Sequence, residues 1–366
     1  MLIAIDAEPA NREMRTGVET AVFNLLKSLM ELEAGSAARR YILFTKKALR
    51  SDWPVLPSNF QHRRLPWPSE YFWAHFRLGM ALRVLKPDLT FILGNIIPFF
   101  APGPVITVIH DIVFVDYPGL HTGRTLFAHT FALKRALQKA SLIITPSQAT
   151  KEAIAGHFPT FEKPITVIPW GIDHQIFRPQ ASDKDEQILQ KFNLADKQYF
   201  LYVGRLEAKK NSQNLISAFR EFKKSRPDVE LVLVGDNQDQ IDLSGARSLG
   251  HQSNAVTAVL YRHALAFVFP TLYEGFGLPV LEAQASGCPV ICSNLAVLKE
   301  VAGAAALFVE PKDTKELIEA LVKLATDGNL RQNLASRGLA NAQKYTWSGT
   351  ARALLETIVK VKPEMV

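Results

Sequence analysis

The sequence predicts an α/β protein that contains two doubly wound, Rossmann-like parallel sheets. Short apolar runs alternate with helical patterns along the chain, which is typical of parallel sheets covered by helices on both faces. The 366 residues exceed what one hydrophobic core usually covers, so we expect two domains of about 170–190 residues each. Hydrophobic residues make up 48% of the chain and charged residues 21%, which excludes an extensively disordered protein.

The apolar runs place the strands of each domain. In the first domain we expect strands at 2–6, 41–45, 89–93, 105–110 and 142–146. In the second domain we expect them at 199–204, 229–235, 265–270, 289–293 and 306–310. The polar, proline-bearing stretch 178–187 is the best linker candidate, and 346–362 has the pattern of an amphipathic helix.

The run PTLYEGFGLPVLE (270–282) carries the strongest functional signal. It follows a buried strand, and Pro279 begins a helical pattern, so Gly275, Phe276 and Gly277 form a turn against a helix N-terminus. Glycines let a backbone come close to a ligand, and the N–H groups and dipole of the helix favour an anion such as phosphate. The alternative is a tight strand-to-helix turn with no ligand.

Two carboxylates flank this turn. Glu274 enters it, and Glu282 lies about one helical turn inside the following helix. Two acids beside a bound anion make sense as acceptors of hydrogen bonds from neutral hydroxyls, as on a sugar or ribose. Two solvated surface acids are the simpler interpretation.

A second signal is the basic loop in YFLYVGRLEAKKN (199–211). Arg205 and Lys210 lie five residues apart after another buried strand, so both side chains can converge on one diphosphate. Asn211 is a plausible N-cap for the helix that follows. Solvated charges at a strand end are the alternative.

Together these stretches resemble the retaining glycosyltransferases of family 4, which have the GT-B fold. VGRLEAKKN is similar to the family's VGRL-x-x-x-K-x motif, and Glu274 with Glu282 matches its E-x7-E pair. Four further segments are similar to family patterns: 15–29, 108–118, 144–154 and 167–173. The resemblance therefore covers nearly the whole chain.

The resemblance implies two Rossmann-like domains that face a cleft. The acceptor-side domain would comprise 1–176, and the nucleotide-sugar-binding domain 177–346. The last helix, at 347–366, would return to the first domain. The implied reaction is retaining transfer of a hexose from a nucleoside diphosphate sugar to a hydroxyl acceptor, with no metal ion and no cofactor.

The resemblance also assigns roles to single residues. Arg205 and Lys210, with backbone N–H groups near Gly277 and Gly17, would stabilise the charge that develops on the β-phosphate. Glu274 would accept hydrogen bonds from the donor-sugar hydroxyls and Glu282 from the ribose. The remaining donor contacts would come from the rest of the turn, at Gly275, Phe276 and Leu278, and from the end of the strand at 105–110, where His110 would contact an outer sugar hydroxyl.

Positive charge is concentrated in one stretch. Residues 39–86 hold ten Lys/Arg and two acids, a net +8, which leaves −1 for the rest of the +7 chain. Trp, Tyr and Phe residues are interleaved with these charges, and this combination favours an anionic membrane surface. The alternatives are a core helix with a solvated basic face, and a nucleic-acid patch, for which no binding module is recognisable.

Two segments bear on localisation. The 22 uncharged residues between Asp88 and Asp111 contain several Gly and Pro residues, so two strands joined by a loop fit better than a membrane span. Cys288 and Cys292, four residues apart on a short strand, cannot form a disulfide. Because a strand begins at residue 2, we expect no signal peptide and a cytoplasmic protein on the inner face of the membrane.

Other chemistries lack their motifs. The P-loop, GxGxxG and His-rich metal spacings are absent, so we expect no resident metal. The segment 108–118 is most similar to mannosyl-transferring members of the family, which favours GDP-mannose over a UDP-hexose as the donor. The basic, aromatic stretch 39–86 favours a lipid-linked glycan acceptor. The alternatives are a UDP-sugar enzyme acting on a soluble acceptor and a degenerate scaffold that binds nucleotide or a partner without turnover.

Overall fold

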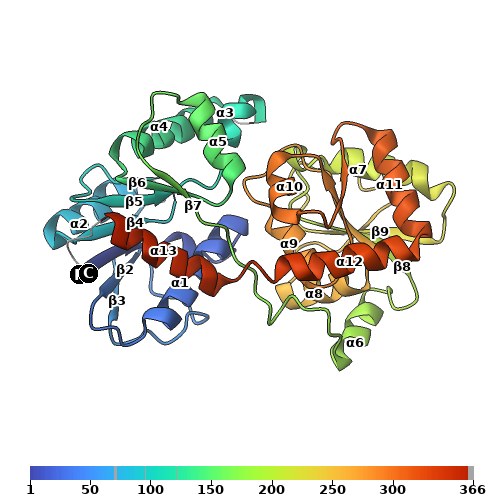
Figure 1. Cartoon of the computed structure of the whole chain (residues 1–366), viewed down its shortest axis with the longest axis horizontal. Coiled ribbons are helices and arrows are strands. Elements are labelled where there is room, and N and C mark those ends of the chain that lie inside the picture. Colours follow the sequence, from blue (N-terminus) through green and yellow to red (C-terminus); the bar gives the residue numbers. More distant parts are fainter. Residues whose placement is uncertain (70–71, 95, 121, 362–366) are drawn as a thin grey trace. The chain divides into compact units, whose positions relative to one another are not determined.

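The computed structural model describes residues 1–69, 72–94, 96–120 and 122–361. The chain forms two compact units (Figure 1). The first contains Met1–Gly171 and the segment from Trp347 onward, and the second contains Ile172–Thr346. The division therefore falls slightly before the predicted boundary after residue 176.

The first unit is built on a seven-stranded parallel sheet with the order β3-β2-β1-β4-β5-β6-β7. The strands are β1 (Leu2–Asp6), β2 (Arg40–Thr45), β3 (Phe60–Arg64), β4 (Leu89–Ile92), β5 (Val105–Val108), β6 (Leu142–Thr145) and β7 (Ile165–Val167). The helices are η1 (Pro9–Asn11), α1 (Gly17–Glu33), η2 (Trp73–Leu78), α2 (Gly79–Leu85), α3 (Val113–Asp116), η3 (Pro118–Leu120), α4 (Gly123–Lys139), α5 (Gln148–His157) and α13 (Trp347–Val361).

All five strands predicted in this half are present, and β3 and β7 are additional. These two strands lie at the edges of the sheet, where a strand needs less apolar burial than a central one. β3 reads FQHRR and buries only its first residue, so it carries no apolar run that a sequence pattern could detect. The uncharged stretch after Asp88 forms β4 and β5 joined by a loop, as predicted.

The C-terminal helix completes the first unit. α13 packs against α1, and Thr350 donates a hydrogen bond to the Pro169 carbonyl at 2.8 Å. The rings of Trp170 and Trp347 lie 6.2 Å apart beside this bond. α13 thus belongs to the first unit, although the residues directly before it belong to the second unit (Figure 1).

The second unit is built on a six-stranded parallel sheet with the order β10-β9-β8-β11-β12-β13. The strands are β8 (Gln198–Val203), β9 (Val229–Val234), β10 (Arg247–Ser248), β11 (Ala266–Phe269), β12 (Val290–Ser293) and β13 (Leu307–Val309). The helices are α6 (Asp183–Lys191), η4 (Ala208–Lys210), α7 (Ser212–Lys223), α8 (Asn254–His263), α9 (Leu278–Ala285), α10 (Ala296–Ala302), α11 (Thr314–Thr326) and α12 (Gly328–Ala342).

The five strands predicted in this half are also present, but the predicted linker is wrong. α6 begins inside 178–187, with a capping box between Ser182 and Asp185. Asp185 is buried and accepts hydrogen bonds from both the Nε and the Nη2 of Arg262, at 2.8 and 2.9 Å. The polar composition of 178–187 predicted a solvated segment. The Asp185 carboxylate can instead be buried, because Arg262 neutralises its charge.

The order of the second sheet positions the site. β8 lies between β9 and β11, and Phe200 and Leu201 of β8 pair with Ala266 and Phe267 of β11. The loops that follow these parallel strands leave the same edge of the sheet as neighbours. The two functional stretches, which are about 60 residues apart in sequence, are therefore adjacent in space. Among the described helices, none combines the length and hydropathy that crossing a bilayer requires.

Candidate active site

Two glycines allow the loops after β8 and β9 to touch. Gly204 and Gly235 have φ values of 146° and 137°, which side-chain-bearing residues rarely adopt. A Cβ on Gly235 would lie 2.0 Å from the Gly204 carbonyl oxygen, so only glycine fits. Beyond this contact the Leu206 N–H donates to the Asp236 carbonyl at 2.9 Å, which holds the loop that carries Arg205.

Arg205 is exposed at the start of this loop. Its Nη1 donates one hydrogen bond, to Gln238 Oε1 at 3.2 Å, and its carbonyl accepts from the Tyr202 hydroxyl at 2.8 Å. Within the described residues no carboxylate forms an ion pair with this guanidinium. Most of its five N–H donors therefore remain available to an anion.

The loops after β8 and β11 are joined by main-chain contacts. The Lys209 carbonyl accepts from the Leu272 N–H at 2.8 Å and from the Thr271 hydroxyl at 3.1 Å. Asn211 has left-handed geometry, with φ of 58°, and its side-chain amide donates to the carbonyls of Pro270 and Pro311. Asn211 is the N-cap of α7, as predicted, but its side chain makes no capping hydrogen bond, because that amide links three loops.

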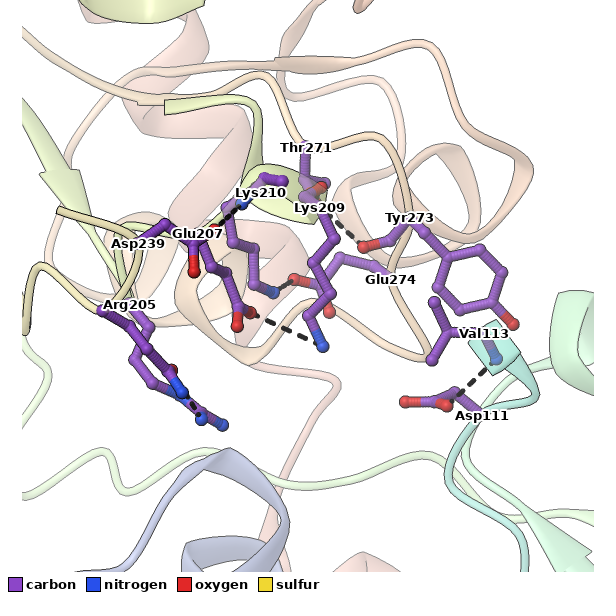
Figure 2. Close-up of polar contacts among 12 residues, drawn as sticks. Asp111, Val113, Arg205, Glu207, Lys209, Lys210, Asp239, Thr271, Tyr273 and Glu274 are labelled. Atoms are coloured by element: carbon purple, nitrogen blue, oxygen red, sulfur yellow. Dashed lines mark hydrogen bonds and ion pairs between the residues drawn. The ribbon is translucent and has the colours of Figure 1, made fainter. Parts of the chain in front are cut away.

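Lys210 and Glu274 form an ion pair across this junction (Figure 2). Their side chains are only 15% and 14% exposed, and the Lys210 Nζ lies 5.2 Å from the centre of the Phe269 ring. Lys209 forms a longer pair with Glu207, at 3.6 Å. Lys210 and Arg205 thus lie on one loop but contact different partners, and their predicted convergence on a diphosphate stays a prediction.

The glycine turn precedes α9, which begins at Leu278 and has Pro279 at its second position rather than its first. Gly277 has a φ of 101°, and a Cβ there would approach Leu298 Cδ2 to 2.7 Å. Phe276 is buried and its ring lies 6.1 Å from that of Tyr345. The turn is therefore tightly packed on one side and presents a helix N-terminus on the other, as an anion site requires.

Glu282 lies inside α9 and accepts a hydrogen bond from the Tyr261 hydroxyl at 3.4 Å. Burial raises the pKa of Glu282 to about 7, because the bond from Tyr261 only partly offsets the loss of solvent. Burial also raises the pKa of the Tyr261 hydroxyl well above its ordinary value, so Tyr261 remains a donor. The Glu282 carboxyl group is thus poised between its charged and neutral forms at neutral pH.

Two predicted residues belong to the first unit. His110 follows β5, and its Nε2 lies 2.9 Å from the Leu93 carbonyl oxygen, which can only accept, so Nε2 carries the proton. Burial lowers the pKa of His110, and the neutral ring presents its Nδ1 lone pair as an acceptor. Gly17 is the first residue of α1, after the N-cap Thr16. Their predicted substrate contacts stay predictions.

Two family models match the chain, one in each half. The profile of Glycosyltransferase Family 4 matches residues 15–176, and the profile of Glycosyl transferases group 1 matches residues 183–340. The two matches together account for most of the chain. The chain belongs to glycosyltransferase family 4.

Several relatives of this family 4 glycosyltransferase are mannosyltransferases by name. The chain is 31% identical to the O-antigen chain mannosyltransferase B of Escherichia coli in an alignment of 256 positions that covers 66% of each chain. It is 29% identical to the O-antigen chain mannosyltransferase RfbU of Salmonella typhimurium, over 66% of this chain and 67% of that one. It is 25% identical to the E. coli serotype-specific mannosyltransferase WbdA, of which the match spans 34%.

Solved structures support the fold of this glycosyltransferase. The sucrose-phosphate synthase of Thermosynechococcus elongatus aligns with a TM-score of 0.77 at 20% identity, over 99% of both chains. WaaG, a glycosyltransferase involved in lipopolysaccharide biosynthesis, aligns with a TM-score of 0.76 at 16% identity, over 98% and 99%. With the two parallel-sheet units, these likenesses confirm the predicted GT-B fold.

Sequence reasoning missed the residues that hold the site together. Tyr261 and Gln238 contact predicted site residues, yet neither belongs to a motif that indicates such a role. Asp239, which accepts from the Ala208 N–H at 2.7 Å, is another. The order of the strands would have pointed to Gln238 and Asp239, because they follow the strand next to β8.

Proposed function

We propose that this glycosyltransferase moves a hexose, with mannose favoured, from a nucleoside diphosphate sugar to a hydroxyl acceptor with retention of configuration and without a metal ion. The observation that carries the proposal is the Lys210–Glu274 pair, because it sets a phosphate-binding cation beside an acceptor for hydroxyl groups at one strand edge. The exposed guanidinium of Arg205 and the N-terminus of α9 supply further positive potential at the ends of the same strands.

The charges suit departure of a nucleoside diphosphate. As the bond between the anomeric carbon and the phosphate oxygen breaks, negative charge accumulates on the β-phosphate. Lys210, Arg205 and the backbone N–H groups near Gly277 stabilise that charge, and fixed donors of this kind are typically worth about 3–4 kcal/mol each. Glu274 accepts hydrogen bonds from the donor sugar, and Glu282 accepts them from the ribose. Family 4 enzymes are described by attack on the same face of the sugar without a covalent intermediate, so we assign Glu274 no nucleophilic role.

Donor and acceptor are proposed from the relatives. Two of the reported relatives are O-antigen mannosyltransferases by name, which supports GDP-mannose as donor and a growing glycan as acceptor. A structural neighbour at 18% identity, Anabaena Alr3699/HepE, was solved with UDP-glucose, so UDP-hexoses belong in the test. We propose a lipid-linked acceptor, met at the cytoplasmic face of a membrane on which residues 39–86 dock.

A donor screen tests the reaction. Purified protein is incubated with GDP-mannose, UDP-glucose and UDP-galactose, and released nucleoside diphosphate is measured with and without excess EDTA. We expect release from one donor, GDP-mannose first, that EDTA does not reduce. Release from none of them would support a scaffold without turnover. If EDTA abolishes nucleoside diphosphate release and Mg²⁺ or Mn²⁺ restores it, the metal-free mechanism is refuted. The anomeric configuration of the product, determined by NMR, tests retention.

The electrostatic part of docking has its own test. Arg63 and Arg64 lie exposed on β3, and Arg83 lies exposed on α2, whereas Arg77 is partly buried. Changing all four to glutamine should weaken co-sedimentation with anionic vesicles at low salt, since each basic side chain near such a surface contributes about 1 kcal/mol. Equal sedimentation of the quadruple variant would show that these arginines are a solvated face.

A further inference from the structure

Five of the exposed phenylalanine side chains of the first unit form one group. They are Phe72, Phe76, Phe99, Phe127 and Phe131, with exposed fractions of 64%, 40%, 38%, 73% and 44%, and we call them the aromatic surface. Apolar side chains that are exposed singly are ordinary on a protein, but a contiguous group marks an interaction site. The sequence pattern pointed only to the first two of them.

The five rings form an unbroken series. Phe72 and Phe76 lie 6.2 Å apart between ring centres, and Phe76 and Phe99 lie 5.8 Å apart. Phe131 continues the series at 6.4 Å from Phe99, and Phe127 at 6.4 Å from Phe131. Three segments that are distant in sequence, around η2, in the β4–β5 loop and on α4, therefore share one apolar surface.

Specific contacts fix these segments to one another. Arg135 of α4 donates from Nε to the Ile97 carbonyl at 2.9 Å and from Nη2 to the Pro98 carbonyl at 2.7 Å. Its guanidinium also lies 5.0 Å from the centre of the Phe99 ring. On the other side, a Cβ on Gly79 would lie 3.4 Å from the Pro98 Cβ, so α2 packs closely on the same loop. The aromatic surface is thus a built feature rather than a loose loop.

The charge around the aromatic surface has one sign. The three segments that carry it, 72–87, 96–104 and 122–140, contain seven basic residues and no acidic residue. The basic residues are Arg77, Arg83, Lys86, Arg124, Lys134, Arg135 and Lys139. Such a surface attracts anionic partners and repels a second copy of itself.

We propose that the aromatic surface inserts into the interfacial layer of an anionic lipid bilayer, with the basic side chains on the headgroups. This inference deepens the proposed function and rests on it in one respect: a lipid-linked acceptor would give the enzyme a reason to bind a bilayer. The exposed fractions favour a bilayer over a single lipid chain, because a groove that holds one chain would bury its lining. Aromatic residues that border a basic face are the composition of interfacial membrane anchors.

The proposal differs from docking through residues 39–86 in what it predicts. Within that stretch Trp53, Phe60 and Trp73 are buried, and Tyr71 lies outside the described residues. Phe72 and Phe76 are exposed within it, but apolar insertion also uses Phe127 and Phe131, which lie more than 40 residues beyond the stretch. It should also persist in part at about 1 M salt, where a Debye length of about 3 Å screens purely electrostatic binding.

The test measures binding to vesicles without donor or acceptor, so failure of the proposed reaction does not affect it. Wild type and the double variant Phe127→Ser/Phe131→Ser are co-sedimented with vesicles of phosphatidylcholine and phosphatidylglycerol. We expect the variant to bind about tenfold more weakly. The matched control is Val55→Ser, because Val55 is 94% exposed and lies within 39–86 but outside the aromatic surface. Its binding should equal that of wild type, and melting curves verify that all variants fold.

A fluorescent label separates insertion from mere proximity. Cys288 and Cys292 are buried, so a polarity-sensitive label reacts with Phe127→Cys or, as the control, with Val55→Cys. We expect a blue shift on vesicle addition at position 127 and none at position 55. The proposal would be overturned if the double variant bound vesicles as tightly as wild type, or if the label at position 127 showed no blue shift on vesicle-bound protein. Either result would mean that the protein binds the bilayer through charge alone.

Discussion

Replacing Gly235 with alanine should disable the donor site while leaving most of the fold intact. The new Cβ would lie 2.0 Å from the Gly204 carbonyl oxygen, and real Cβ atoms approach no nearer than 3.0 Å. The loop that carries Arg205 must therefore move by about 1 Å, and a misplacement of that size costs about 10²-fold in rate. The φ of 137° adds backbone strain of about 1–3 kcal/mol to the stability cost.

The assay compares two alanine variants. Gly250 also has a positive φ, 62°, but a Cβ there meets nothing within 4 Å. Gly250→Ala therefore reports strain without the clash, and we expect it to lose stability but keep its turnover. Nucleoside diphosphate release from the preferred donor and the melting temperature are measured for both. Wild-type turnover in a folded Gly235→Ala variant would refute the placement of Arg205 by this contact.

Three further predictions follow from the site and its supports. Lys210→Ala should lower turnover by about 10²-fold or more in a folded protein, and Lys210→Arg should recover part of it, as donor turnover would show. A ribose hydroxyl that donates a hydrogen bond to Glu282 stabilises its carboxylate and lowers its pKa from about 7. Binding of the sugar nucleotide should therefore release protons, and its affinity should increase as the pH rises from about 6 to 8. Calorimetry in two buffers measures the proton release, which the Glu282→Gln variant should lack. Asp185→Asn should cost about 3–5 kcal/mol of unfolding free energy at pH 7, because Arg262 loses its partner; an unchanged urea midpoint would contradict this.

The pH dependence of that last effect has a definite sign. Burial alone would raise the pKa of Asp185, but hydrogen bonds from Arg262, Ser182 and His263 outweigh it and hold the pKa well below its ordinary value. A lowered pKa contributes stability above the unfolded value of about 3.9, and that contribution is lost as the pH falls below it. The difference between wild type and Asp185→Asn should therefore shrink in acid.

The sequence predicted the central strands well because burial on both faces requires continuous apolar runs. β3 and β7 were not predicted, because edge strands need no such run. The prediction of a linker at α6 was wrong because the segment is polar in sequence, whereas its Asp185 is buried and paired with Arg262, 77 residues later. The motifs identified Lys210 and Glu274 individually. Their contact depended on the adjacency of β8 and β11, which no local pattern contains.

The contacts of single side chains were harder to predict for the same reason. Asn211 has the residue type and position of a helix cap, yet its amide reaches the ends of two other strands instead. The aromatic surface is a similar case, because Phe99 and Phe131 come together only after β4, β5 and α4 have packed. Local propensity decides which element forms, whereas tertiary contacts decide which polar or apolar groups a side chain meets.

The Lys210–Glu274 pair links the fold of the second unit to its chemistry. In the free protein each group satisfies the other, so two largely buried charges are tolerated at the strand edge. A diphosphate would add negative charge beside Lys210 and repel Glu274 unless the carboxylate gained new donors. The hydroxyl groups of a sugar supply those donors, whereas a free nucleoside diphosphate does not. The pair should therefore favour the intact sugar nucleotide over the product, and replacing Glu274 with glutamine should narrow the ratio of their dissociation constants, as titration calorimetry would measure. A ratio unchanged by Glu274→Gln would show that the carboxylate does not sense the sugar.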